Sequence, residues 1–237
     1  MSIQFFAPRG ADNQLVKLPP ALRRTVRWLP RIGNIFPDFD VETTQGSLKF
    51  WEWAEGHWVH LFSHPAAKTP VCTTEIASIA SYSSAWRAAN VKNLALTGST
   101  TEDQEEWHAD IARLFNVKVD FPCAHDPDLK LSRLFGMMHE KESETWPIRK
   151  SFLIDPAQHL RMIFEYPIFI GRRTDEVLRV VHALRLRDRT GAATPSDWED
   201  GDIAIIPDDR PEAHVWQEFG ANSTRLRDYL RVVEPVR

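Results

Sequence analysis

Cys72 is the residue best placed to act as a nucleophile, because the residues just before it predict the start of a helix. Thr69 is a favourable helix N-cap residue, whose hydroxyl can accept from an unpaired amide, and Pro70 is a favourable first helical residue. Cys72 then falls in the first helical turn, where free N–H groups and the helix dipole favour an anion. A thiol there is expected to ionise more readily than in water, and the thiolate is the nucleophilic form. The alternative is a small buried apolar residue, as lone cysteines often are.

Two elements must position this cysteine. Residues 58–62 are a short apolar run that predicts a strand ending just before the cysteine segment. From Thr74 to Ala89, apolar side chains recur at helical spacing and predict a helix with one face against a sheet. The sequence therefore places Cys72 at a strand-to-helix junction.

The remainder of the central region predicts strands and helices in alternation. The predicted elements are a strand at 91–97, a helix from Thr101 with a capping box formed with Gln104, a short helix at 129–135, strands at 151–154 and 160–164 joined by a turn at 155–158, and a last core helix from Thr174. Residues 126–146 read as an irregular connection around the short helix. This order of elements is that of an α/β protein with a thioredoxin-like fold.

The two ends differ from this core. Residues 1–30 predict an N-terminal extension with a short helix across 21–28, and residues 186–237 predict an extended C-terminal arm with a small strand at 203–206 and a terminal helical segment. The thioredoxin-like domain is then residues 31–185. The N-terminal extension is rich in arginine and poor in acidic residues. We expect a cytoplasmic protein, and organelle targeting by this segment is the minority alternative.

The composition narrows the classes of function. Apolar residues make up 43% and charged residues 26% of the 237 residues, as in globular proteins. A net charge of -4 argues against nucleic acid as a partner, and no apolar run is long enough to span a membrane. Two cysteines are too few for a disulfide framework. His57 and His60 fall on opposite sides of a strand, so we expect no metal site.

The cysteine segment resembles the active-site signature of the peroxiredoxins. The pattern Pro65-x-x-x-Thr69-x-x-Cys72 followed by Thr73-Thr74-Glu75 carries this resemblance, and Phe62-Ser63-His64 before it is similar to the one-Cys branch, the peroxiredoxin-6-like subfamily of the AhpC/TSA family. Further blocks match in order at 32–39, 43–46, 126–137, 171–179 and 193–202, so the resemblance runs from residue 31 to 207. The family independently implies the thioredoxin-like fold.

The resemblance implies a thiol-specific peroxidase that acts on hydrogen peroxide and organic hydroperoxides without metal, haem or flavin. Cys72 corresponds to the cysteine that attacks the peroxide and becomes a sulfenic acid, and Arg149 to the arginine that faces the developing negative charge. Thr69 would direct its hydroxyl toward the sulfur, or serve only as a helix cap. Pro65 would shield the sulfenic acid from water, or simply end the strand.

Three more residues take supporting roles in this prediction. Arg172 matches a second arginine near the family's pocket, and His64 matches the histidine beside the cysteine in one-Cys members, where it would tune the thiolate or guide the reductant. Glu75 is expected to be structural and to add negative charge to the first turn of the helix. Lys68 stands where the family usually has an aromatic residue, and it could add positive potential near Cys72.

Cys123 does not match a resolving cysteine of the two-Cys branches, so the sulfenic acid must be reduced by an outside thiol such as glutathione or a thioredoxin-type protein. The family also implies a homodimer in which the C-terminal arm reaches the partner, with higher oligomers as the alternative. A competing hypothesis is a holdase or redox-signalling scaffold that keeps the fold without catalysis. Loss of Cys72 or Arg149 would favour that hypothesis, and both are present.

Overall fold

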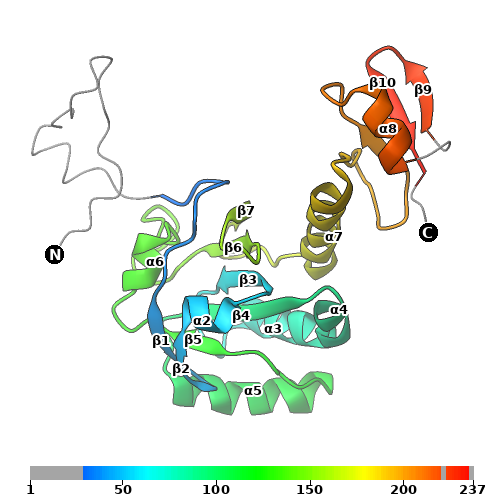
Figure 1. Cartoon of the computed structure of the whole chain (residues 1–237). Coiled ribbons are helices and arrows are strands. Elements are labelled where there is room, and N and C mark those ends of the chain that lie inside the picture. The colour runs from blue at the N-terminus through cyan, green and yellow to red at the C-terminus, as the bar shows by residue number, and fades with distance from the viewer. Residues whose placement is uncertain (1–28, 220–222, 235–237) are drawn as a thin grey trace, which may run out of the picture.

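The computed structural model describes residues 29–219 and 223–234, and Figure 1 shows their arrangement. One sheet has seven strands in the order β2-β1-β5-β4-β3-β6-β7. A second sheet has three strands, β8 (Ala204–Ile206), β9 (Ser223–Arg227) and β10 (Leu230–Val233), in the order β8-β10-β9. The strands of the large sheet are β1 (Asp40–Thr43), β2 (Gly46–Lys49), β3 (Trp58–Ser63), β4 (Val91–Thr97), β5 (Cys123–His125), β6 (Arg149–Ile154) and β7 (Leu160–Tyr166). The helices are α2 (Phe50–Ala54), α3 (Pro70–Ser81), α4 (Ser83–Ala88), α5 (Thr101–Phe115), α6 (Lys130–Leu134), α7 (Thr174–Thr190) and α8 (Glu212–Phe219).

The strand directions confirm the predicted fold class. Strands β3, β4 and β5 run parallel, joined by helical crossovers, whereas β6 pairs antiparallel with β3 and β7 antiparallel with β6. The hairpin of β6 and β7 turns at residues 155–158, as predicted. This is a mixed sheet with helices on both faces, the thioredoxin-like arrangement.

Strand β3 lies inside the sheet and is buried along its whole length. Because side chains alternate along a strand, Trp58 and Phe62 enter an apolar core with α3, α4, α5 and α7. Val59 and Leu61 enter a second core on the other face, with α2 and α6. The sheet is thus fixed from both sides, and the chain leaves β3 from a rigid position just before the cysteine segment.

The sequence predicts one continuous helix over 74–89, and this prediction is wrong. The segment is two helices, α3 and α4, separated at Tyr82. The side chain of Ser81 donates back to the Ser78 carbonyl, and the Tyr82 amide bonds to Ile79 three residues earlier, so the last turn of α3 tightens and ends.

The start of α5 is also shifted by one residue from the prediction. Thr100, not Thr101, is the N-cap, and its hydroxyl accepts from the Asp103 amide at 3.1 Å. Gln104 donates to the Ser99 carbonyl at 3.1 Å instead of closing a capping box with Thr101. Strand β4 and the short helix α6 lie where the sequence predicts them.

Several strands were not predicted. β1 and β2 are strands of four residues each that pair as a hairpin with mostly exposed polar side chains, and β5 has only three residues. Segments this short carry little periodicity. They become strands because they pair with one another and, through β5, with β4 of the same sheet.

The C-terminal region forms a small module beyond α7, set apart from the large sheet in Figure 1. Helix α7 starts at Thr174 as predicted and continues to Thr190, across the predicted boundary at 185, and Gly191 follows it with φ +73°. Strand β8 (Ala204–Ile206) agrees with the sequence. The predicted helical segment is present as α8, but it is not terminal, because the unpredicted hairpin of β9 (Ser223–Arg227) and β10 (Leu230–Val233) follows it. The division into three domains stays a prediction.

The module shares an apolar core with the end of α7. This core is formed by Leu186 of α7 with Ala192, Trp198, Ala204, Ile206, Val215 and Val233. The helix predicted over 21–28 lies outside the described residues. Within the described ranges, no helix has the length and apolar character needed to cross a bilayer.

Candidate active site

Cys72 lies in the first turn of α3, as the sequence predicts, and its side chain is fully buried. Thr69 occupies the N-cap position with extended backbone, but its hydroxyl caps nothing: it donates to the Ala66 carbonyl at 2.9 Å. The predicted capping bond is therefore wrong, although the cap position is right. The Thr73 amide closes the first helical bond to the Thr69 carbonyl, so the Cys72 amide precedes that bond and can donate toward the site.

Arg149 stands at the start of β6, the neighbour of β3 in the sheet, and is brought to the cysteine by the sheet register. Its Nη1 lies 3.4 Å from Cys72 Sγ, and its Nε donates to the Ile168 carbonyl at 2.6 Å. Only 2% of the residue is exposed. A guanidinium stays charged in this setting, so a fixed cation faces the sulfur.

Glu75 has a different role from the predicted one. Helix α3 has no acidic residue in its first turn, and Glu75 points into the core instead. Its Oε2 accepts from Arg149 Nη1 at 2.5 Å and from Arg172 Nη2 at 2.9 Å, and its Oε1 accepts from Arg172 Nε at 2.9 Å. Burial alone would raise the pKa of this carboxyl, but the charges and hydrogen bonds of the two arginines outweigh burial and lower it. Glu75 is the shared counter-ion of both arginines.

His64 is buried at the end of β3, beside the Trp107 ring at a centroid distance of 5.6 Å. Neither ring nitrogen has a well-formed hydrogen bond within residues 29–219 and 223–234. Burial, followed by the positive charge of Arg172, lowers the pKa of His64 to about 3. The ring is therefore neutral at physiological pH and contributes no charge to the site.

Pro65 and Lys68 shape the loop before α3. Pro65 is buried, and its carbonyl accepts from the Thr97 hydroxyl at 3.3 Å. Lys68 has a left-handed backbone (φ +57°), and its Nζ lies 2.6 Å from Glu106 and 3.8 Å from Asp103 on α5. Lys68 is thus paired with acidic side chains at the surface of α5, and its contribution to the potential at Cys72 stays a prediction.

Sequence reasoning missed two side chains that hold the loop. The Thr73 hydroxyl donates to the Thr69 carbonyl at 2.7 Å, and Trp107 Nε1 donates to the same hydroxyl at 3.0 Å. Thr73 belongs to the motif, but the motif alone does not assign its hydroxyl a role. The sequence signal is weak, because the tryptophan lies on α5, 34 residues away.

Cys123 lies on β5 and is fully buried, with its Sγ 3.4 Å from His108 Nε2. Burial raises the pKa of this thiol strongly, so Cys123 stays protonated at neutral pH. A protonated buried thiol is a poor nucleophile. Among the described residues, no group of three or more histidine, cysteine or acidic side chains could hold a metal ion.

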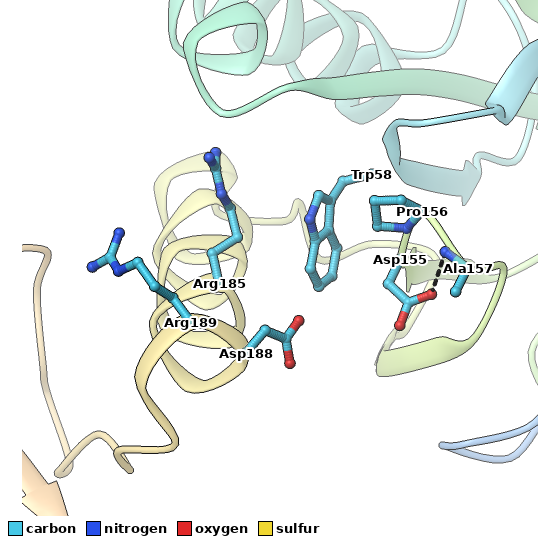
Figure 2. Close-up of a pocket in the computed structure, with 7 residues that line it drawn as sticks. All are labelled: Trp58, Asp155, Pro156, Ala157, Arg185, Asp188 and Arg189. Atoms are coloured by element: carbon cyan, nitrogen blue, oxygen red, sulfur yellow. Dashed lines mark hydrogen bonds between the residues drawn. The ribbon is translucent and has the colours of Figure 1, made fainter. Parts of the chain in front are cut away.

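A hollow of about 530 Å³ lies away from this site, lined by Trp58, Asp155, Pro156, Ala157, Arg185, Asp188 and Arg189 (Figure 2). Trp58 is the first residue of β3, at the opposite end of the strand from the cysteine loop. Both carboxylates in the hollow already pair with Arg161, at 3.0 Å to Asp155 and 2.7 Å to Asp188. The hollow includes none of the predicted site residues.

Comparison with known proteins agrees with this geometry. The AhpC/TSA family model matches residues 32–163. The mitochondrial peroxiredoxin PRX1 of Saccharomyces cerevisiae is 36% identical over 208 residues, covering 85% of this chain and 79% of its own length, and the 1-Cys peroxiredoxin of Dictyostelium discoideum is 33% identical over 202 residues, covering 85% and 84%.

Solved structures give the same result. A yeast mitochondrial 1-Cys peroxiredoxin matches with a TM-score of 0.80 and 36% identity, covering 86% of this chain and 99% of that chain. A cysteine-to-serine mutant of the peroxiredoxin 6 of Arenicola marina also gives a TM-score of 0.80, at 29% identity, covering 86% and 97%. The chain therefore belongs to the AhpC/TSA family and is a one-Cys peroxiredoxin, a thiol-dependent peroxidase.

Proposed function

We propose that Cys72 is the peroxide-reactive nucleophile and that Arg149 is its cationic partner. The observation that carries this proposal is the 3.4 Å contact between Arg149 Nη1 and Cys72 Sγ in a buried site. The Cys72 thiolate attacks one peroxide oxygen, a sulfur–oxygen bond forms and the oxygen–oxygen bond breaks. Sulfur is oxidised to sulfenic acid, and the leaving oxygen takes a proton and departs as water or an alcohol.

The groups around the sulfur can hold the peroxide during this step. Arg149 Nη2 has no hydrogen bond to the described residues and can donate to a peroxide oxygen, as can the Cys72 amide. The Thr69 hydroxyl, whose own proton goes to Ala66, can accept from the peroxide hydroxyl. Pro65 shields the sulfenic acid from water in this proposal.

Glu75, itself held by Arg172, holds Arg149 in place. His64 lines the site as an uncharged side chain. Because the pKa of His64 is about 3, its protonation does not change between pH 5 and pH 8. Titration of His64 therefore does not contribute to the pH dependence of the peroxide reaction in that range. His64 acts, in our proposal, on the approach of the reductant.

An external thiol completes the cycle. The sulfenic acid reacts with one thiol to give a mixed disulfide and water, and a second thiol releases Cys72 and leaves as a disulfide. The buried, protonated state of Cys123 supports an outside reductant. The related yeast structure concerns thiol resolution through glutathione and thioredoxin systems, which supports the same two classes here.

The sheet edge supports a homodimer. β7 is the outermost strand of the large sheet and is only partly buried, so its outer backbone groups can pair with a second strand. Phe169 and Ile170, just beyond it, are 78% and 53% exposed. In our proposal two copies join at this edge and the C-terminal module reaches the partner. Analytical ultracentrifugation of the wild type and Phe169→Glu tests the proposal: a dimer that the variant converts to monomer is expected, and a wild-type monomer or a larger ring contradicts it.

The proposed location is the cytoplasm. The mitochondrial relative from yeast supports the alternative, in which the arginine-rich segment 1–30 directs the chain to an organelle. Cell fractionation of the full chain and of a chain lacking residues 1–28 separates these two. Cytoplasmic recovery of both chains is expected, and recovery of only the full chain in mitochondria would overturn the proposal.

Turnover with a thiol donor tests the roles of the two site residues. Cys72→Ser should abolish peroxide consumption. Arg149→Lys keeps the positive charge but loses the planar guanidinium with its several N–H donors, and it should lower the rate about 10²-fold. Arg87→Lys is a matched control, because that side chain is 69% exposed and lies on α4. Full activity of Arg149→Lys would remove Arg149 from the mechanism.

A further inference from the structure

Three buried polar side chains behind the active site have no part in the reaction described above. His60 lies on β3, Asn93 on β4 and Ser151 on β6, and 2%, 5% and 0% of their surfaces are exposed. The register pairs His60 with Asn93, and it pairs Ser151 with Phe62, two residues along β3 from His60. The three side chains therefore lie on the same face of the sheet.

The hydrogen bonds among these three side chains fix which atom of each donates and which accepts. Asn93 Oδ1 lies 2.9 Å from His60 Nδ1, and because an amide oxygen only accepts, Nδ1 carries the ring proton. Burial, then the charge of Arg172, lowers the pKa of His60 to about 3, so the ring is neutral and Nε2 is an acceptor. Ser151 Oγ, 3.0 Å from Nε2, must donate to it. With the Asn93 amide reversed, the Ser151 proton would have no acceptor among its contacts in the described residues.

The same chain of bonds continues to the active site. Because Ser151 gives its proton to His60, its oxygen is free to accept from Arg172 Nη1 at 3.1 Å. Arg172 donates through Nε and Nη2 to Glu75, at 2.9 Å each. Glu75 in turn accepts from Arg149 Nη1 at 2.5 Å, the nitrogen that contacts the nucleophile. The bonds are continuous from Asn93 to the sulfur.

The surroundings argue against a ligand site at this position. His60, Glu75 and Arg172 line a cavity of about 10 Å³, which holds about one water molecule and no substrate. The His60 ring is stacked on Phe62 at 4.8 Å and on Trp86 at 5.5 Å between ring centroids. The imidazole is thus fixed in place, and among the described residues its two nitrogens bond to Asn93 and Ser151 alone.

The geometry points to His60 as a positioning residue of the peroxidase. By orienting the Ser151 hydroxyl, His60 fixes the guanidinium of Arg172 and hence the carboxylate that holds the active-site arginine. An apolar side chain of similar bulk would fill the space but leave the Ser151 proton without its acceptor. The inference rests on the proposed roles of Cys72 and Arg149.

Two variants at this position test the inference. His60→Leu fills the space but cannot accept, whereas His60→Gln can accept from Ser151 and donate to Asn93. The measurements are the rate constant of Cys72 oxidation by hydrogen peroxide and the pH midpoint of Cys72 alkylation by iodoacetamide. We expect His60→Leu to lower the rate about tenfold and move the midpoint to higher pH, and His60→Gln to restore the rate to within about threefold. A purely structural role would move neither quantity in folded protein.

Ser151→Ala keeps the test decisive if His60→Leu does not fold. It should by itself lower the rate about tenfold. Where His60→Leu folds, the double variant His60→Leu/Ser151→Ala should lose little more than either single variant, because both changes break the same chain of hydrogen bonds. Wild-type rate and midpoint in Ser151→Ala, or in a folded His60→Leu, overturn the inference and leave the peroxidase proposal intact. If the wild type itself does not react at Cys72, the proposed function fails first, and the inference fails with it.

Discussion

Removing the charge of Glu75 should destabilise the protein far more than removing a carboxylate at the surface. Glu75 is the shared counter-ion of Arg149 and Arg172, and the side chains of all three residues are 2–4% exposed. Glu75→Gln keeps the shape but leaves two buried guanidinium groups with an uncharged partner. Breaking a buried ion pair from one side costs about 3–5 kcal/mol. For a chain of this length, that loss lowers Tm by about 6–20 °C.

The assay is urea unfolding at pH 7, followed by tryptophan fluorescence, with Glu52→Gln as the matched control. Glu52 pairs with Lys49 at 3.2 Å, but its side chain is 74% exposed, so the control should change the free energy of unfolding by less than about 1 kcal/mol. A Glu75→Gln protein within about 1 kcal/mol of the wild type would refute the buried counter-ion account.

The pH dependence supplies a second test of the same residue. The folded-state pKa of Glu75 is lowered from its ordinary value, so the unfolded state binds the proton more readily. Its stabilising contribution is present above the unfolded pKa and is lost as pH falls through the folded pKa. The difference in unfolding free energy between wild type and Glu75→Gln should therefore be largest near pH 7 and shrink below about pH 4. A difference in unfolding free energy that grows as the pH falls would contradict the lowered pKa of Glu75.

Three further predictions concern the surroundings of the site. Lys68→Met removes the exposed pair with Glu106, so the midpoint of urea unfolding should fall only slightly at low salt and less still at 1 M salt; a large, salt-independent loss speaks against an ion pair. Because burial raises the pKa of the Cys123 thiol, peptide mass mapping after brief iodoacetamide treatment of the native protein at pH 8 should find the label on Cys72, and equal labelling would contradict this. Asp126→Ala removes the carboxylate that accepts from two amides of α6 and should cost about 1–2 kcal/mol in thermal unfolding, whereas an unchanged Tm would rule that role out.

Local signals in the sequence predicted the elements that present the cysteine. The apolar run of β3, the Thr69-Pro70 start of α3 and the spacing of the motif all act within a few residues, and the structure places them as expected. The placement of Arg149 next to Cys72 came from the family resemblance. The two residues are 77 positions apart, and nothing in the local pattern joins them.

The errors follow from contacts that no local pattern reveals. Glu75 was assigned to a helix dipole because its position in the motif is near the start of α3, but its partner Arg172 lies 97 residues away. Thr100 and Thr101 are equally good caps by type, and the extended backbone at Thr100 decides between them. The pairing of Lys68 with Glu106 of α5 is likewise a contact that no local pattern reveals.

The central claim, that Cys72 is the residue that reacts with peroxide, is tested most directly by rapid mixing of the reduced protein with hydrogen peroxide. Tryptophan fluorescence gives the rate, and intact mass gives the product, for the wild type, Cys72→Ser and Cys123→Ser. We predict fast gain of one oxygen atom in the wild type and in Cys123→Ser, and none in Cys72→Ser. Oxidation that persists without Cys72, or a wild type no faster than a free thiol, would contradict the account.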